Sequence, residues 1–255
     1  MKYNKNTKII SNTQLTEDIY DLRLECPGIA SEAKPGQFVN IYLNDSAYML
    51  PRPISICEAD DGVIRLVYRV VGSGTGQLSR MKQGEALDIT GTVGNGYDTE
   101  LINKTYSNVA LFGGGVGIPP MVELSKRLNV KTDVFLGYRD VLFLDKDFPA
   151  SASVYISTED GSAGTKGNVM DALEESGVTP DCICACGPGP MIRAIRKYAK
   201  EKGIKAFFSL EEHMACGVGA CLACVCTTKE IDGHSQVKNA RVCVDGPVFD
   251  AEILA

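Results

Sequence analysis

The N-terminal part of the chain, to about residue 102, is a series of short runs in which apolar and polar positions partly alternate. The clearest runs are 19–24, 37–43, 63–71 and 86–90. Turn residues separate them, most plainly Pro27-Gly28 and Pro35-Gly36. A period of two in short segments, with frequent turns between them, is typical of half-buried antiparallel strands. The pattern predicts a small antiparallel β-barrel.

From about residue 106 the pattern changes. Residues 109–112 are wholly apolar, as in a strand that a parallel sheet buries on both faces. Further strands are expected at 134–139, 153–157 and 181–186, with one helix ending near residue 128 and another at 169–176. Strands that alternate with helices after a separate β region predict a parallel-sheet α/β domain.

Residues 208–255 form a third segment, which is too short to bury much of a core by itself. A bound metal centre would supply the missing stabilisation, because metal-binding free energy is folding free energy in such small units. We therefore expect a multi-domain β and α/β protein divided at 1–103, 104–207 and 208–255.

Composition narrows the possible partners and compartment. The net charge of −6 argues against nucleic acid and against an anionic membrane surface. We see no secretory signal and no apolar run near the roughly 20 residues that a membrane span needs. These features predict a cytoplasmic protein, in which ten cysteines indicate metal ligands or free thiols rather than disulfides.

The most specific chemical signal is a cysteine cluster near the C-terminus. Cys216, Cys221 and Cys224 follow C-x4-C-x2-C, the spacing with which plant-type ferredoxins ligate a [2Fe–2S] cluster. A fourth thiolate is needed, and Cys243 lies downstream. The glycines between the first two cysteines leave room for close backbone approach to the sulfides.

Other assignments of the cysteines fit the spacing less well. A structural zinc site usually joins two C-x2-C units, whereas only Cys221 and Cys224 form one here. Cys226 breaks the ferredoxin spacing and is interpreted as a nearby packing thiol. Cys182 and Cys184 share a strand face with Cys186, but successive members lie about 7 Å apart, so the first two are expected to be buried packing thiols.

Two segments of the predicted barrel carry possible anion contacts. Arg52 opens a strand and can hold a phosphate oxygen by charge-assisted hydrogen bonds, and Ser55 three residues later adds a hydroxyl group. Gly74 and Thr75 lie in a glycine-rich turn that lets backbone amides approach an anion. The alternative for the Arg52 segment is a Pro-bent edge strand with a surface arginine. The alternative for the Gly74 segment is a plain hairpin turn. The first segment resembles the R-x-[YF]-[ST] flavin signature of the ferredoxin reductase family, with Ile54 where an aromatic residue is usual.

In the α/β region, residues 113–121 connect a strand to a helix through glycines, an arrangement that places a phosphate at a helix N-terminus. A tight turn without a ligand is the alternative. The run from Gly114 to Pro120 resembles the nicotinamide-nucleotide motif of ferredoxin reductases, and the run from Cys186 to Met191 is similar to one that lies near the nicotinamide.

An acidic pair, Glu159-Asp160, follows the third strand of this region. Carboxylates there would repel a 2′-phosphate, which favours NAD over NADP. Two acids in a solvated turn are an equally good interpretation.

Taken in order, these motifs make the chain similar to the electron-transfer subunits of bacterial NAD-dependent dihydroorotate dehydrogenases. The resemblance implies FAD, a 2Fe-2S cluster and NAD as cofactors, and an FMN-containing catalytic subunit as partner in a heterotetramer. It implies an NAD-linked flavin and iron–sulfur oxidoreductase of pyrimidine biosynthesis that passes electrons from the partner's FMN through 2Fe-2S and FAD to NAD. No side-chain acid or base is expected.

The resemblance also implies a set of contacts. For FAD they are Arg52, Pro53, Ile54, Ser55, Tyr68, Arg69, Val70, Gly74 and Thr75; for the nucleotide Gly114, Gly115, Gly117, Cys186 and Gly187; for the cluster Cys216, Cys221, Cys224 and Cys243. Two rivals stay open: a sulfide- or ferredoxin-linked NAD(P)H oxidoreductase built from similar modules, and a non-enzymatic zinc-bearing interaction module.

Overall fold

The computed structural model describes residues 2–233 and 235–255. The chain forms two compact units. The first contains the residues up to Gly96 together with Glu212–Pro247, and the second contains Tyr97–Glu211 together with Val248–Ala255. The predicted division into three domains stays a prediction.

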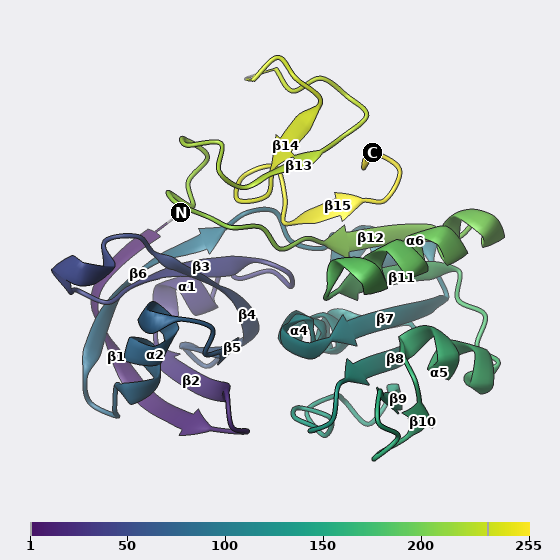
Figure 1. Ribbon diagram of the computed structural model, residues 1–255, viewed down its shortest axis with the longest axis horizontal. Helices are drawn as coiled ribbons and strands as arrows, with labels where there is room; N and C mark the ends of the chain where they lie inside the picture. Colours follow the sequence, from purple (N-terminus) through teal and green to yellow (C-terminus); the bar gives the residue numbers. More distant parts are fainter. Residues whose placement is uncertain (1, 234) are drawn as a thin grey trace. The chain divides into compact units, whose positions relative to one another are not determined.

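The first unit is built on a closed six-stranded barrel in which every pair of neighbours is antiparallel (Figure 1). In barrel order its strands are β1 (Lys2–Gln14), β2 (Ile19–Glu25), β5 (Val63–Arg69), β4 (Arg52–Asp60), β3 (Phe38–Tyr42) and β6 (Ala86–Val93). Inward-facing residues such as Leu22, Leu24, Ile64 and Leu66 are completely buried and form the core. The predicted antiparallel barrel is confirmed, and closure leaves it no unpaired edge strand.

The connections between the barrel strands contain short helices, which are α1 (Pro27–Ala30), the 3-10 turn η1 (Ser46–Tyr48) and α2 (Ser73–Arg80). The last of these corrects the sequence interpretation. The predicted glycine-rich turn at 72–76 is instead the start of a helix, with Gly72 as its N-cap. The Thr75 hydroxyl accepts hydrogen bonds from the backbone N–H groups of Val71 and Gly72 at 3.0 and 3.2 Å. These bonds fix the helix start despite two glycines within the helix.

The C-terminal part of this unit, 212–247, contains one small sheet in its described residues, the antiparallel pair β13 (Val225–Thr227) and β14 (Asn239–Arg241). Among its described residues, the buried apolar side chains are Cys224, Val242, Cys243 and Pro247 alone. We call this segment the cysteine module. As expected for so small a piece, it has almost no core of its own.

The second unit contains a seven-stranded sheet in the order β10-β9-β8-β7-β11-β12-β15 (Figure 1). The strands are β7 (Asn108–Gly114), β8 (Lys131–Tyr138), β9 (Ser153–Thr158), β10 (Thr165–Lys166), β11 (Cys182–Cys186), β12 (Lys205–Ser209) and β15 (Val248–Asp250). All pairs are parallel except β12 with β15. The predicted parallel sheet is confirmed. Its antiparallel edge strand, which comes from the end of the chain, was not predicted.

Helices α3 (Thr99–Thr105), α4 (Pro119–Arg127), α5 (Val169–Ser176) and α6 (Gly189–Lys202) and the 3-10 turn η2 (Gly115–Gly117) complete this unit. Helix α5 has the predicted bounds, because Asn168 caps its start and Gly177, at φ 65°, ends it in the left-handed region. Helices α5 and α6 contact each other as well as the sheet. In the part of the chain that the structure describes, no helix combines the length and apolar character of a membrane span.

Three aromatic rings stack across the middle of the sheet in the second unit. Phe135 is completely buried between Phe112 and Tyr155. The centroid of its ring lies 4.9 Å from that of Phe112 and 4.8 Å from that of Tyr155. We predict that Phe135→Ala lowers the free energy of unfolding by about 3–5 kcal/mol, because the substitution leaves a cavity at the centre of the stack. Urea unfolding followed by circular dichroism measures this.

Val141→Ala is the control for that prediction, since Val141 is 57% exposed and its truncation should change stability by about 0.5 kcal/mol or less. Equal effects of the two substitutions would contradict the central role of the stack.

Candidate functional site

The structure brings the four predicted cluster cysteines together as two pairs. The thiols of Cys216 and Cys221 contact each other through a hydrogen bond, and so do those of Cys224 and Cys243. The two pairs also interact electrostatically, because Cys216 raises the pKa of Cys243 through a Coulomb interaction. Cys224 and Cys243 are buried, whereas Cys221 is exposed.

Backbone N–H groups surround these sulfur atoms. The N–H of Val218 donates to Cys216 Sγ at 3.4 Å, the N–H groups of Ala220 and Cys221 also donate to Cys216, and the N–H of Gly219 donates to Cys243. Burial acts to raise the pKa of Cys216, but the N–H donors and the Cys221 thiol lower it to about 7. The loop is therefore suited to hold negatively charged sulfur.

At Cys243 the balance is different. Burial and then the adjacent Cys224 thiol raise its pKa to about 12. Two such thiols in contact favour a shared cation, because a metal ion deprotonates the thiols that coordinate it.

The pairing fits a two-iron centre better than a single zinc ion. A [2Fe–2S] cluster held by four cysteines takes two thiolates on each iron, whereas tetrahedral zinc needs four ligands around one point. Across residues 2–233 and 235–255, no three or more His, Cys, Asp or Glu side chains gather in a way that could hold a single ion. The residues present therefore match the binuclear group in number and chemistry, and their two pairs correspond to two ligands for each iron.

The shape of the loop depends on two glycines. Gly217 and Gly219 have φ values of +64° and +84°, in the left-handed region that glycine tolerates. A Cβ on Gly217 would lie 2.5 Å from Asn40 Nδ2, and one on Gly219 would lie 2.5 Å from Val244 Cγ2. The predicted need for glycine between the cysteines thus includes contacts with the barrel and with the Cys243 turn.

Asn40 was missed by sequence reasoning. It lies on β3 opposite Pro53 of β4, is completely buried, and donates from Nδ2 to the carbonyl oxygen of Gly217 at 3.3 Å. The signal available in the sequence was a polar residue between Val39 and Ile41, which both belong to the barrel core. Asn40 attaches the loop that carries Cys216 to the barrel.

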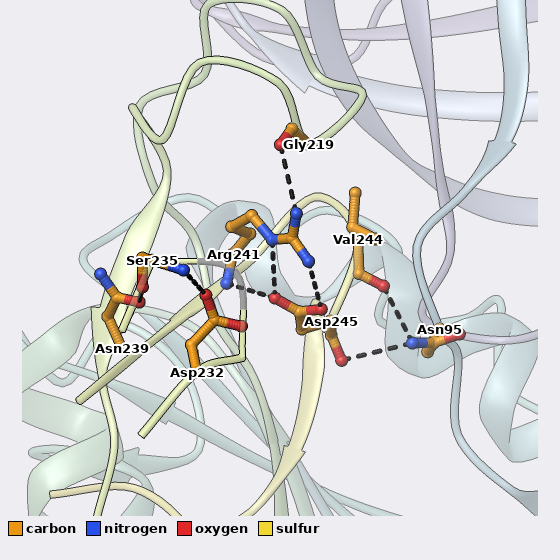
Figure 2. A network of polar contacts seen from close by, with 8 residues as sticks. All are labelled: Asn95, Gly219, Asp232, Ser235, Asn239, Arg241, Val244 and Asp245. Carbon is orange, nitrogen blue, oxygen red and sulfur yellow. Dashed lines mark hydrogen bonds and ion pairs between the residues drawn. The ribbon is translucent and has the colours of Figure 1, made fainter. Parts of the chain in front are cut away.

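Figure 2 shows a second set of contacts, around Arg241. Its Nε and Nη2 atoms donate to the two carboxylate oxygens of Asp245 at 3.0 and 3.2 Å, and its Nη1 donates to the Gly219 carbonyl at 3.3 Å. Asn95 Nδ2 donates to the carbonyls of Val244 and Asp245 at 3.0 and 3.3 Å. These bonds join the Cys216 loop, the Cys243 turn and the end of the barrel.

Cys226 lies on β13, half-buried and opposite Ala240 of β14. Burial raises its pKa. Its interpretation as a packing thiol stays a prediction.

The predicted flavin residues come from two elements that meet. A Cβ on Gly74 would lie 2.1 Å from Arg52 Nε, so the guanidinium rests against the start of α2. Arg52 Nη1 also donates to the carbonyls of Tyr48 and Leu50, and the guanidinium lies 5.3 Å from the centre of the Tyr48 ring. A cation beside a helix N-terminus is a suitable site for phosphate oxygens.

The other predicted flavin residues differ in what they can offer. Pro53, Ile54 and Ser55 lie on β4 opposite β3, and Ile54 packs against the barrel core. The Tyr68 ring is buried, stacked on Tyr20, with its hydroxyl donating to Asn12 at 3.2 Å. Any ligand contact by Tyr68 would thus use the backbone.

Arg69 and Val70 follow Tyr68. Arg69 pairs with Asp18 at 3.0 Å on the surface, and Val70 packs partly against the core. The Thr75 hydroxyl, expected to face an anion, also donates to the Gly72 carbonyl at 3.2 Å.

The predicted nucleotide residues meet where the strand order of the sheet reverses. Strands β8, β9 and β10 follow β7 on one side, and β11 and β12 lie on its other side. The C-terminal ends of β7 and β11, which carry Gly114 and Cys186, are therefore neighbours at a topological switch point, where open α/β sheets bind ligands.

Close packing at this point requires glycine. A Cβ on Gly117 would lie 2.2 Å from the Cys186 carbonyl oxygen, and one on Gly187 would lie 3.0 Å from the Gly114 nitrogen. Gly115, at φ 53°, turns the chain between β7 and α4. The five predicted nucleotide residues thus form one compact double turn, with the N-terminus of α4 beside it.

The remaining cysteines of the second unit behave as buried thiols. Cys182, Cys184 and Cys186 are all completely or almost completely buried on β11. Burial raises the pKa of Cys184 and of Cys186 well above the usual range of a thiol. The expectation that Cys182 and Cys184 are buried thiols is confirmed.

The acidic pair lies after β9, and both residues are exposed. Asp160 accepts a hydrogen bond from the Ser162 N–H at 3.0 Å, which lowers its pKa. This carboxylate is therefore ionised and shapes its own turn, and its role in nucleotide choice stays a prediction.

We predict that Gly217→Ala lowers the free energy of unfolding by about 1–3 kcal/mol, because alanine strains the left-handed backbone and its Cβ collides with Asn40. Urea unfolding, together with limited proteolysis of the cysteine module, measures the effect. Gly233→Ala is the matched control in the same module, since no heavy atom lies within 4 Å of its added Cβ. Equal stability of the two variants would contradict the prediction.

Comparisons with known proteins agree with this geometry. Residues 211–255 match the iron-sulfur cluster binding domain of dihydroorotate dehydrogenase B. The electron transfer subunit of dihydroorotate dehydrogenase B (NAD(+)) from Fusobacterium nucleatum is 40% identical over 257 residues, covering 95% of this chain and 96% of that protein. The subunit of the same name from Bacillus cereus strain G9842 is 40% identical over 258 residues, with 98% and 97% coverage.

Solved structures agree as well. An NADH-dependent reduced ferredoxin-NADP oxidoreductase is 31% identical with a TM-score of 0.87, covering 100% of this chain and 91% of that one. The ferredoxin reductase of carbazole 1,9a-dioxygenase, 20% identical with a TM-score of 0.66 over 80% of this chain and 67% of that one, shares the fold. On the strength of its full-length relatives, the chain belongs to the family of electron transfer subunits of dihydroorotate dehydrogenase B (NAD(+)).

Proposed function

We propose that this chain is the electron transfer subunit of an NAD-linked dihydroorotate dehydrogenase of pyrimidine biosynthesis. Oxidation of dihydroorotate to orotate on an FMN-bearing partner would release two electrons and two protons. A 2Fe-2S cluster held by the four cysteines would relay the electrons one at a time, and FAD held by this chain would collect both electrons with one proton from solvent and supply the hydride that reduces NAD. The observation that carries the proposal is the two contacting cysteine pairs, Cys216 with Cys221 and Cys224 with Cys243, in a chain whose full-length relatives bear this name.

Within the first unit, the chain's own residues bind and position. Arg52 and the N-terminus of α2, which meet at Gly74, provide positive charge and backbone donors for the FAD pyrophosphate. The half-buried start of β4, with Ser55, and the backbone of residues 68–70 at the end of β5 would contact the flavin ring system. The buried Tyr68 ring supports this edge from behind.

Within the second unit, the double turn of β7 and β11 binds the nucleotide. Gly114, Gly115 and Gly117 let a pyrophosphate approach the backbone at the start of α4. Cys186 and Gly187 lie beside the same point. Burial raises the pKa of the Cys186 thiol, so this buried thiol would stay uncharged beside a bound nucleotide and would not act as a nucleophile.

The partner is expected to dock over the exposed part of the cysteine module. Val218, Leu222 and Val244 are 42%, 37% and 38% exposed, and they stand in the two loops that carry Cys221 and Cys243. Apolar side chains that remain exposed around a redox site suit burial by another protein. A heterotetramer with two copies of each subunit, in the cytoplasm, completes the proposal. The absence of any disulfide among the ten cysteines supports this compartment.

A second candidate is favoured by one observation. The NADH-dependent reduced ferredoxin-NADP oxidoreductase is 31% identical and has a TM-score of 0.87. A subunit that serves ferredoxin instead of dihydroorotate would need the same flavin, cluster and nucleotide sites. The greater identity of the dihydroorotate dehydrogenase relatives, 40%, favours the first proposal.

Co-expression tests the choice. The chain is produced with and without the FMN-bearing, dihydroorotate-oxidising subunit from the same organism. Both preparations are assayed for dihydroorotate-dependent reduction of NAD. Activity that requires both chains supports the proposal. A stable complex that reduces NAD only with reduced ferredoxin would support the second candidate.

We predict that Cys221→Ser abolishes electron transfer from the partner while NADH still reduces the flavin, because the cluster loses a ligand and the FAD site is untouched. Iron content, paramagnetic signal and rapid-mixing flavin reduction measure this. Cys226→Ser is the matched control and should retain iron and activity. Loss of the cluster from the Cys226 variant, with retention in the Cys221 variant, would reverse the assignment.

We also predict a preference for NADH over NADPH, because Glu159 and Asp160 place negative charge after β9. The ratio of kcat/KM for flavin reduction by the two nucleotides measures it. Exchanging both acids for their amides should narrow the ratio by raising kcat/KM for NADPH. A wild-type preference for NADPH would contradict the prediction.

A further inference from the structure

Arg241 occupies a place from which it contacts both halves of the cysteine module. It lies two residues before Cys243, and its side chain is only 18% exposed. Its Nη1 atom reaches the Gly219 carbonyl in the other loop at 3.3 Å, while Nε and Nη2 bind the Asp245 carboxylate (Figure 2). A guanidinium charge is thereby held in a fixed position between the two loops.

The contact with Gly219 leads directly to a sulfur atom. The carbonyl of Gly219 and the N–H of Ala220 belong to one peptide unit, and that N–H donates to Cys216. A cation that binds the carbonyl end of a peptide polarises it and strengthens the hydrogen bond at its N–H end. Arg241 therefore acts on Cys216 through one peptide plane, in addition to its direct electrostatic interaction with Cys243.

Asp245 sets the opposite charge. It lies two residues after Cys243, accepts from the backbone N–H of Arg241 at 2.7 Å as well as from its side chain, and is 32% exposed. Positive charge and N–H···S bonds stabilise an iron–sulfur cluster that has gained an electron, and negative charge destabilises it. The pair therefore combines two opposing influences at one point.

We propose that Arg241 and Asp245 are positioning residues that tune the reduction potential of the 2Fe-2S cluster in opposite directions, Arg241 upward and Asp245 downward. The inference rests on the proposed function, because it takes the four cysteines as the cluster ligands. It assigns a role to side chains that do not themselves ligate iron. A fixed potential lets the cluster accept electrons from the partner and pass them on without trapping them.

The test uses the midpoint potential of the cluster in the full chain, measured by redox titration followed by electron paramagnetic resonance. Arg241→Gln should shift the potential down, since it removes the cation and leaves the carboxylate unpaired. Asp245→Asn should shift it up. The double variant Arg241→Gln/Asp245→Asn should lie between the two.

Opposite shifts separate tuning from a merely structural clamp, which would change cluster stability in the same direction in both variants and leave the potential of the remaining cluster unchanged. Shifts of the same sign, or none, would overturn the inference. Should Arg241→Gln retain no cluster, the double variant is compared with Asp245→Asn alone. Removing the guanidinium in that background must still lower the potential, and failure to do so overturns the inference.

Lys238→Gln is the charge control, because Lys238 is an exposed cation just before β14 and solvent screens its field. Its potential should equal that of the wild type, and a shift as large as that of Arg241→Gln would count against a specific role for Arg241. The iron content of the wild type distinguishes a failure of the proposed function from a failure of the proposed tuning. Absence of iron would refute the proposed function itself, whereas iron with unshifted potentials refutes only the tuning.

Discussion

The structure of the first unit depends on polar bonds that attach a nearly coreless segment to a rigid barrel. The cysteine module buries little apolar surface, so hydrophobic packing cannot fix its loops. Asn40 binds the loop of Cys216, and Asn95 binds the turn of Cys243, each from a strand or strand end of the barrel. Metal binding then adds the free energy that such a small module lacks. Ligand geometry is therefore set largely by the barrel.

The second unit depends instead on glycine, at a point where two backbone turns approach closely. At the switch point the β7 and β11 turns approach so closely that a single methyl group on Gly117 would strike the backbone of Cys186. Glycine at such a point serves two ends, because it permits the packing and leaves backbone donors open to a pyrophosphate. The helix that begins at Pro119 adds its N-terminus to the same place.

Much of the fold and of the candidate site could be predicted from local patterns. Period-two runs predicted the barrel strands, and the C-x4-C-x2-C spacing brought out the cysteines that the structure pairs. What was missed depends on contacts between distant residues. Asn40 and Gly217 lie 177 residues apart in sequence, and no local pattern connects them. The role of Arg241 likewise depends on a peptide in another loop, although the residue stood beside a predicted ligand.

Helix α2 was missed for a local reason. Gly74 and Gly76 disfavour a helix by propensity, and the capping by Thr75 and the fit of Gly74 against Arg52 outweigh that preference. The edge strand β15 was missed because three residues carry too little periodicity to predict a strand. In addition, the whole cysteine module separates it in sequence from its pairing partner β12.

That pairing has a consequence for the construction of the molecule. Ser209 at the end of β12 is the direct neighbour of Val248 at the start of β15, so everything between them is, topologically, the loop of one β-hairpin. A reductase-like sheet with a short turn at this position would be complete without the segment. The iron-binding part can thus be gained, exchanged or lost as a cassette during evolution, with both of its ends held a single strand spacing apart and the hydrogen bonds of the sheet left undisturbed.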